Sequence, residues 1–519
     1  MKASRRQTTL SFKCKIVTLT LLYLPMVTVK ADEFDTAEQL KKLQQMVQEL
    51  QQQRLEQDKQ IELLTKEIVG IENQVSQVKI VKSEEKGSSK GVPVMTNFKD
   101  GISFEDGSGD WKLGISGRVQ ADYRQFFPNE VAADTYSLRR ARLGGTLTFY
   151  KDYVVRIEGE FAGSNTSLTY GYIDINKLSF VKIRLGQFKP SYGLERTMST
   201  NFTDFQERSI ADGLLGNTFD RGVMVFGAPT VGFTYSLASV NGAGGGDENN
   251  NLADGKDTTA RLTINAAEWL IWQNSVMHLG GFYASGQEGS RRQSGFIPTG
   301  QGDARGLRFF ETTCSNNNAT STSTCGVALA NGFSQNVERT RAGLEMAVAY
   351  GPVKLQSEYI KLSFNGQNIN RAIDSNYISA MWNITGESFS SYYKEGIFGR
   401  LIPKTNYKSG ALGWGALQLG LRYDRFDATD FKTSNQAGTG VLLNVSPVIS
   451  STPDGLLTAT NKANEWTLGA NWIFNPNVRF VANYIHTNYE TPVSLRVNGK
   501  NYFNIDKDYA LTMRAQFDF

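Results

Sequence analysis

Apolar and polar residues alternate with a period of two along most of the chain after Trp111. Between residues 112 and 127, one parity carries Leu113, Ile115, Val119 and Tyr123, while the other is polar. The last segment, 508–519, repeats the pattern. A period of two is that of a β-strand, whose successive side chains point to opposite faces. The chain after Trp111 is therefore predicted to be all-β.

The length and number of these segments favour a membrane barrel over a soluble sheet. Strands of about ten residues or more with aromatic ends, alternately joined by short turns and long polar loops, are typical of barrels with an apolar outer face and a polar lumen. Bacterial barrels have an even number of strands. Sixteen are predicted, near 112–127, 136–150, 152–162, 168–175, 177–187, 222–229, 231–240, 258–266, 274–285, 338–350, 352–363, 376–384, 412–426, 464–474, 476–488 and 508–519.

Composition supports this fold class. The chain has 50 Gly, 30 Phe and 21 Tyr among 519 residues, and only 20% of its residues are charged. A disordered chain would not carry this aromatic content. No apolar run of 18 residues follows the first 30, which excludes a helical membrane protein. We therefore predict a 16-stranded antiparallel transmembrane β-barrel over 98–519, preceded by an α-helical coiled coil.

Residues 1–31 have the pattern of a secretory signal. Basic residues up to Lys15 precede an apolar run from Ile16 to Val29, and small residues at Val29 and Ala31 suit cleavage before Asp32. A retained anchor is the alternative. These 31 residues hold six basic side chains and no acid, so the net charge of +4 becomes −2 without them. Bulk charge therefore gives no support for a nucleic-acid partner.

Residues 32–82 carry a heptad pattern. Ten of twelve core positions between Leu40 and Val78 are apolar, and Arg54 and Gln57 form a polar layer. More than five such heptads indicate a coiled coil, and β-branched core residues favour more than two strands. The polar, Gly- and Ser-containing stretch within 83–97 reads as a linker. An exported coiled coil would lie in the periplasm, where it could reach the cell wall.

Two cysteines remain after the signal, Cys314 and Cys325, on either side of a short polar segment. In an exported protein this spacing suggests a disulfide that closes a loop, although two free thiols are the alternative. No His or carboxylate cluster accompanies them, and neither a metal nor another cofactor is expected.

Parity sorts the charged residues of the predicted strands. In 136–150 it points Arg140 and Arg142 into the lumen and Arg139 outward. The same sorting predicts a ladder of inward bases, namely Arg118, Arg124, Arg156, Lys182, Arg184, Arg261, Arg339, Arg341, Arg422 and Arg514. Inward acids are fewer. Each base could simply be solvated or paired with an acid. As a set, an excess of arginine in a water-filled lumen would attract anions.

The segment 188–221 is too long to be a turn between neighbouring strands. A loop of this size could fold into the barrel and narrow it. It contains the hydroxyls of Ser199 and Thr200 and the cations Lys189, Arg196 and Arg208.

Several motifs make residues 98–519 resemble the phosphate-selective porins of Gram-negative outer membranes. The motifs are Arg139-Arg140-Ala141-Arg142, Leu-Gly-Gln-Phe-Lys-Pro-Ser-Tyr-Gly-Leu-Glu at 185–195, Gln206-Glu207-Arg208, Asn-Trp-Ile-Phe-Asn-Pro-Asn at 471–477, and Arg-Ala-Gln-Phe-Asp-Phe at 514–519. The resemblance implies a trimer of 16-stranded barrels in the outer membrane that passes phosphate or other small anions.

The resemblance also implies which residues form the constriction. Arg139 and Arg140 match a basic pair on the wall, in conflict with the outward parity of Arg139. Arg196, Ser199, Thr200 and Arg208 match donors of the inward loop. Lys189 and Arg142 replace aromatic residues of the family's pattern. Both replacements add positive charge, which leaves open whether phosphate, polyphosphate or another anion is preferred.

Three other functions are compatible with parts of the chain. A general porin would share the barrel, and a cell-envelope tether or adhesin would use the coiled coil. An outer-membrane hydrolase would usually need a His base. His278 and His486 stand on separate predicted strands without a nucleophile motif, so an enzyme is not predicted.

Overall fold

The computed structural model divides the chain into two units, Met1–Gly91 and Val92–Phe519. Apart from Gln48, the structure describes residues of the second unit only: 94–97, 101–127, 134–178, 180–216, 218–242, 256–288, 307, 309–310, 337–366, 369–408, 413–430, 455–458, 460–497 and 500–519. The predicted signal, the coiled coil but for Gln48, and the cysteine pair lie outside the described residues.

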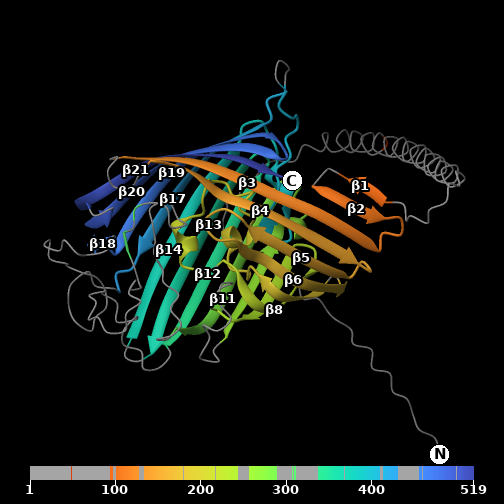
Figure 1. Cartoon of the computed structure of the whole chain (residues 1–519), viewed down its shortest axis with the longest axis horizontal. Helices are drawn as coiled ribbons and strands as arrows, with labels where there is room; N and C mark the ends of the chain where they lie inside the picture. The colour runs from red at the N-terminus through yellow and green to blue at the C-terminus, as the bar shows by residue number, and fades with distance from the viewer. Residues whose placement is uncertain are drawn as a thin grey trace, which may run out of the picture. The chain divides into compact units, whose positions relative to one another are not determined.

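Sixteen antiparallel strands form one closed barrel, as predicted (Figure 1). They are β3 (Trp111–Phe127), β4 (Thr135–Phe149), β5 (Tyr153–Glu160), β6 (Ser167–Leu178), β7 (Val181–Phe188), β8 (Asp220–Thr230), β9 (Phe233–Val240), β10 (Asp257–Asn265), β11 (Ser275–Glu288), β12 (Val337–Tyr350), β13 (Val353–Gly366), β14 (Ile369–Asn383), β17 (Ala416–Asp427), β19 (Lys462–Asn475), β20 (Val478–Val497) and β21 (Lys500–Asp518). Each strand pairs with the next, and β21 also pairs with β3, which closes the barrel.

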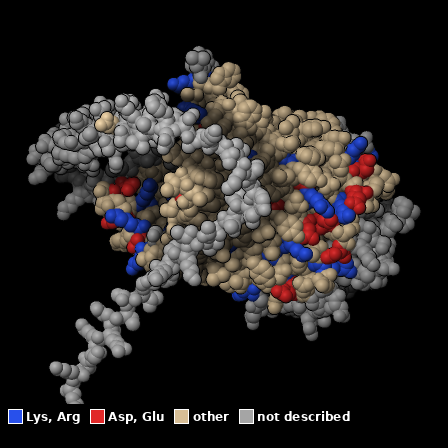
Figure 2. Space-filling model, turned by 180° about the vertical axis from the view of Figure 1, so that it is seen from behind, with Lys and Arg blue, Asp and Glu red and all other residues tan. Residues whose placement is uncertain are grey.

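Alternation along the strands separates an apolar outer face from a polar inner face. Leu344, Leu421 and Tyr484 are exposed on the outside, whereas their neighbours Glu345 and Arg422 are buried inside. Uncharged side chains make up much of the face shown in Figure 2. This is the arrangement that a barrel in lipid requires. Among the described residues, no helix is both long and apolar enough to cross a membrane.

Several strands extend further than their sequence patterns predict. β14 begins at Ile369, and β20 and β21 run together as a long hairpin around residues 498–499. A short strand, β18 (Gly455–Thr458), pairs with the outer part of β20. The alternation of apolar and polar residues weakens there because both faces of the hairpin can be polar beyond the lipid.

A hairpin precedes the barrel. β1 (Val94–Asn97) pairs with β2 (Ile102–Asp106), and β2 pairs with the start of β3 next to the point where β21 ends. The predicted linker over 83–97 therefore includes a strand. Gly101 lies against the chain's end with a φ of 110°, and a Cβ there would meet the carbonyl oxygen of Ile115 at 2.8 Å. Only glycine fits this position.

The segment 188–221 folds into the barrel. It contains two short helices, α2 (Leu194–Thr197) and α3 (Ile210–Gly213). The Glu358 carboxylate on β13 accepts hydrogen bonds from the backbone N–H groups of Leu194 and Glu195, at 2.6 and 2.9 Å. These contacts hold α2 against the inner wall.

A second segment, 384–415, also enters the lumen, and this corrects the prediction of tight turns at that end of the barrel. It connects β14 to β17 and contains a 3-10 turn, η1 (Phe389–Tyr392), and a small hairpin, β15 (Tyr393–Lys394) with β16 (Ile397–Phe398). Phe389 and Phe398 are buried in one apolar cluster with Met198 and Phe205 of the first segment. The two segments therefore meet inside the barrel.

A third inward contact comes from the connection between β11 and β12. Leu307, Phe309 and Phe310 are buried with Leu214 and Phe426 in the largest apolar cluster. A short helix, α4 (Ala266–Trp269), connects β10 to β11. The two apolar clusters lie mainly against β11–β14 and β17–β20, so the lumen on that side is filled by side chains.

Candidate functional site

A β-bulge decides where Arg139 points. Gln120 of β3 pairs with Arg140 of β4, but the next residue, Ala121, pairs with Leu138, so Arg139 is the extra residue. A bulge re-aims side chains and breaks the alternation. Arg139 donates from Nε to the Glu207 carboxylate of the inward segment at 3.0 Å. The outward orientation predicted by parity is wrong, and Arg139 and Arg140 both face the lumen.

The sequence contains a signal for this bulge. Leu138 and Ala141 are both suited to the lipid face, yet they are three residues apart and cannot share one face of a regular strand. An arginine facing lipid near the bilayer centre costs about 2–4 kcal/mol. A bulge between the two apolar residues avoids that cost and brings both arginines inside.

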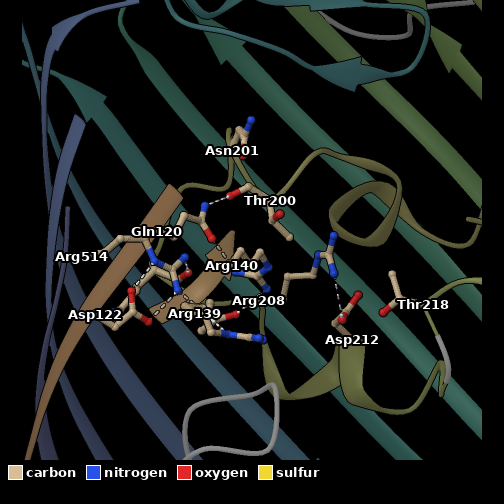
Figure 3. A network of polar contacts seen from close by, with 12 residues as sticks. Gln120, Asp122, Arg139, Arg140, Thr200, Asn201, Arg208, Asp212, Thr218 and Arg514 are labelled. Carbon is tan, nitrogen blue, oxygen red and sulfur yellow. Dashed lines mark hydrogen bonds and ion pairs between the residues drawn. The ribbon is translucent and has the colours of Figure 1, made fainter. Parts of the chain in front are cut away.

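Glu207 is the centre of a network of ion pairs and has no role in the sequence-based prediction. Its partners Arg139, Arg140 and Arg514 are labelled in Figure 3. Its carboxylate contacts Arg139, Arg140, Arg124 and Arg514, from three different strands. Burial raises the pKa of Glu207, but the attraction of these four arginines outweighs burial and holds the pKa well below its usual range. Glu207 is therefore ionised and ties the inward segment to β3, β4 and β21.

Beside this network lies a cavity of about 220 Å³. It is lined by Arg118, Arg139, Arg140, Arg142, Tyr170, Lys189, Ser199, Thr200, Arg208, Thr218 and Phe219. Seven of the eight residues predicted for the constriction are in this set. Among the described residues, six cations and no carboxylate line the cavity. Such a surface has the chemistry of an anion site.

Lys189 is a lining cation whose hydrogen-bond acceptors are backbone carbonyl oxygens. Its Nζ donates to the carbonyl oxygens of Thr197 and Met198, at 3.0 and 2.8 Å. Within the described residues, no carboxylate lies at ion-pair distance from it. Burial of the ammonium and the charges of Arg208 and Arg196 lower the pKa of Lys189 well below its usual range. An anion in the cavity would act as the counter-ion of the Lys189 ammonium.

Arg208 and Arg196 differ in position. Arg208 lines the cavity and donates to the backbone oxygens of Glu195, Arg196 and Met198. Arg196 lies outside the lining. Its Nε donates to the Asp212 carboxylate at 2.7 Å, and its other nitrogens reach backbone carbonyls around α3. Arg196 therefore braces the fold of the inward segment.

The predicted basic ladder separates into two groups. On the β10–β21 side, arginines are buried in pairs with acids, such as Arg261 with Glu345 and Arg422 with Asp424. Arg339, Arg341 and Arg514 belong to the same group, as does Arg124 on β3, the strand that pairs with β21. For this group, the structure agrees with the interpretation that each base is paired with an acid of the barrel wall.

On β5 and β7 the ladder residues are more open. The Arg156 side chain is 30% exposed, against 0% for Arg514. Arg184 and Lys182 are also partly exposed. Arg156 contacts Glu158 and Arg184 contacts Asp174, both at 2.7 Å. Arg118, on β3, lies between the two groups: it lines the cavity, donates to the Thr200 hydroxyl at 2.9 Å and lies 3.6 Å from Glu158.

No metal site accompanies the cavity. Within the part of the chain that the structure describes, no group of three or more His, Cys, Asp or Glu side chains could hold a metal ion. The residues that sequence analysis missed are Glu207 and three uncharged lining residues, Tyr170, Thr218 and Phe219. None of these carries a signal by itself, because only the inward fold of the segment brings them to the cavity.

A closed 16-stranded barrel with an apolar outside, a segment folded into its lumen and a cation-lined cavity beside that segment defines an outer-membrane porin. The family model described as "Phosphate-selective porin O and P" matches residues 113–519. The chain belongs to this family, as its motifs predict.

The chain is also similar to individual known proteins. The chain is 26% identical to Porin O of Pseudomonas aeruginosa over 415 residues, which cover 77% of this chain and 88% of the relative. Similar solved structures include an anion-selective porin from Comamonas acidovorans, at 12% identity and a TM-score of 0.47, covering 79% of this chain and all of that one. OmpT of Vibrio cholerae is similar at 12% identity and a TM-score of 0.43, covering 79% and 99%.

Proposed function

We propose that this porin is an anion-selective diffusion channel whose preferred solutes are phosphate or polyphosphate, held transiently in the cavity beside the inward segment. The observation that carries the proposal is the lining of that cavity by six cations without a carboxylate among the described residues. Arginine suits a phosphate group because its planar guanidinium donates two parallel hydrogen bonds to an oxyanion.

The charge balance around the cavity supports this selectivity. Among the described residues, the six lining cations contact four carboxylates, those of Glu158, Glu160, Glu207 and Asp212, and most of these acids are shared with further arginines. Positive charge is therefore in excess. In a narrow, partly desolvated lumen the effective dielectric is lower than in water, so this excess attracts anions more strongly.

The departures from the family's pattern favour a highly charged solute. Lys189 and Arg142 stand where the pattern has aromatic residues, and both line the cavity. Arg142 already pairs with Glu160 at 2.6 Å, whereas Lys189 has only carbonyl partners. A polyphosphate, with more charge than phosphate, would gain more from the added cation.

The test is planar-bilayer recording of the purified protein. The reversal potential in a salt gradient gives the sign of the selectivity, and titration of phosphate against a chloride current gives the affinity. We expect anion selectivity and block by phosphate. Arg140→Gln should weaken the block, whereas Arg425→Gln, at an exposed outer position, should not. Equal block of both variants, or cation selectivity of the wild type, would refute the proposal.

We also propose how the chain is assembled. The signal at 1–31 would be removed before Asp32, and the coiled coil at 32–82 would stand in the periplasm and join three chains. Support comes from the heptads and from the trimer that the family resemblance implies. Light scattering in mild detergent should give the mass of a trimer, and a monomer would exclude it. Deleting residues 32–90 should leave a barrel that still folds.

A further inference from the structure

Aromatic rings line one wall of the lumen, beginning at the cation-lined cavity. Phe219 and Tyr170 belong to the cavity lining and pack edge to face, with ring centroids 5.0 Å apart. Tyr172 follows on β6, its ring 5.9 Å from that of Tyr170. Phe226 comes next on β8 and packs in the same apolar cluster as Tyr172. These four rings form a continuous series from the cavity along β6 and β8.

Each ring carries a cation over it. Arg142 lies over Phe219 with its Cζ 5.5 Å from the ring centroid, and Arg156 lies 4.4 Å over Tyr170. Arg184 contacts two rings, at 3.8 Å from Tyr172 and 5.0 Å from Phe226. Lys182 lies opposite Phe226 in the strand register and 5.9 Å from its ring. We call these four rings and four cations the cation–aromatic column.

The column lies on the wall that the inward segments leave open. The two large apolar clusters fill the lumen along β11–β14 and β17–β20. The column stands on β4–β8 and the end of the inward segment, where Arg156, Lys182 and Arg184 keep part of their surface exposed. A solute that leaves the cavity along this wall therefore meets rings and cations together.

We propose that this porin binds and passes anions that carry an aromatic ring, such as aryl phosphates, in preference to saturated anions of the same size and charge. The proposal rests on the proposed function, because the cations of the cavity must first hold the anionic group. Phe219 and Tyr170 are half-buried at the cavity and would contact the ring of the solute.

The size of the cavity agrees with an anion larger than a single phosphate group. Its volume of about 220 Å³ is several times the share of one water molecule in the liquid, which is about 30 Å³. The lining is also divided in chemistry, with cations from β3, β4 and the inward segment and rings from Tyr170 and Phe219. A solute with a charged end and a flat apolar end matches both parts.

A simpler role for the rings is to hold the arginines in place. Cation–π contacts would do this whether or not a solute ever touched a ring. The two roles predict different results. If the rings only position arginines, an aromatic and a saturated phosphate ester of equal charge bind equally. If the rings contact the solute, the aromatic ester binds more tightly.

The experiment compares three blockers of the chloride current in planar bilayers: inorganic phosphate, phenyl phosphate and cyclohexyl phosphate. Each is titrated on the full-length protein. The free energy of one contact between two aromatic rings corresponds to a preference of about tenfold at most for the aromatic ester over the saturated one. We expect phenyl phosphate to block at a concentration three- to tenfold lower than cyclohexyl phosphate. This comparison uses the wild type alone, so it does not depend on the folding of any variant.

Three variants locate the preference. Tyr170→Leu and Phe219→Leu remove a ring and should bring the ratio of the two esters close to one. Tyr170→Phe keeps the ring and should retain the ratio. Tyr283→Leu, at an exposed outward tyrosine of β11, is the matched control and should leave both blocks unchanged.

Each outcome decides a separate point. Equal block by the two esters, with block by inorganic phosphate intact, overturns the aromatic preference and leaves the proposed function standing. A preference that survives both Tyr170→Leu and Phe219→Leu overturns the assignment to the column. Absence of block by all three anions overturns the proposed function itself. A preference that is lost in the Leu variants and retained in Tyr170→Phe supports the proposal.

Discussion

The segments 188–221 and 384–415 both fold into the barrel and both bury apolar side chains there, but only the first also contributes a carboxylate, Glu207, that is shared by several buried arginines of the wall. They enter from opposite ends, after β7 and after β14, and meet in the apolar cluster that contains both Phe205 and Phe398. In the first, Glu207 contacts four arginines and Asp204 pairs with Lys354 at 2.7 Å. In the second, Phe389 and Phe398 are buried in the apolar cluster, and Arg400 makes an ion pair with Asp518 at the end of β21.

The difference has a physical consequence. A carboxylate buried in the lumen needs a partner of opposite charge on the wall. The carboxylates of the first segment therefore lie next to arginines of the wall, and the cavity lies beside these arginines. Among its described residues, the second segment contacts the wall mainly through rings and one peripheral ion pair, Arg400 with Asp518, and so changes the charge near the cavity less. The first segment should therefore determine which ions pass, and the second should determine mainly how wide the passage is.

Removing the Glu207 charge should have the largest effect. Glu207→Gln leaves several buried arginines without their shared counter-ion, and breaking a buried pair costs about 3–5 kcal/mol. The free energy of unfolding in detergent, followed by circular dichroism, measures the loss. The control in the other segment is Glu387→Gln, because Glu387 accepts from the backbone N–H of Lys404 at 3.1 Å and from a hydroxyl. It should lose about 1 kcal/mol. Equal losses would contradict the comparison.

Removing a ring from the second segment should have the next largest effect, and on a different property. Phe398→Ala should destabilise by about 3 kcal/mol, the lower end of the range for Phe→Ala, because a small hairpin beside the lumen can relax. Single-channel conductance should rise while the reversal potential stays that of the wild type. A shift toward cation selectivity would mean that this segment also determines which ions pass.

Replacing either Arg139 or Arg140, the two arginines at the β-bulge of β4, should weaken the affinity for phosphate by about 10- to 100-fold. A charge-assisted hydrogen bond contributes about 1.5–3 kcal/mol, so Arg139→Ala and Arg140→Ala should each raise the phosphate concentration for half-block by about 10- to 100-fold. Arg196→Ala should change it less, because Arg196 braces α3 through Asp212. An unchanged affinity in Arg139→Ala would show that inward orientation alone does not make an anion ligand.

Lys189 should make anion binding depend on pH, and this is the smallest effect. Its pKa is lowered, so the ammonium is present at low pH and is lost as pH rises through that lowered value. Phosphate affinity should therefore fall, by about tenfold or less, at a pH where ordinary lysines are still charged. Lys189→Arg should abolish the dependence because arginine stays protonated. A wild type and a Lys189→Arg variant with the same pH profile would contradict this.

The strands were predictable because each has a strong local pattern. The apolar parity of 112–127 and of 508–519 must face lipid, so neither strand can shift register by one residue without turning its polar face outward. The last hairpin was underestimated because Lys500 and its neighbours extend beyond the lipid, where the pattern no longer alternates. The sequence leaves most of the segment 384–415 as a connection between two strands, and its inward fold is not predictable locally because its rings pack against residues that are distant in sequence.

The constriction shows the limit of local pattern. Parity placed Arg140 correctly and Arg139 wrongly, since one extra residue in β4 interrupts the alternation between Leu138 and Arg140. Seven predicted residues line the cavity, but Arg196 does not, although it lies in the same inward segment as Arg208. Sequence motifs specify the types of residues and their order. They do not specify which side of a short helix faces the open lumen.

The sequence by itself determined the class of this protein: an all-β chain of sixteen strands with an apolar and a polar face, and with the motifs of a porin family. These properties follow from the period of two and from residue identity, which act within a few neighbours along the chain. The tertiary structure alone decided which arginines are paired and which line the cavity. Glu207 meets Arg514 across about 300 residues of sequence, at 2.5 Å, and only closure of the barrel around the inward segment brings them together.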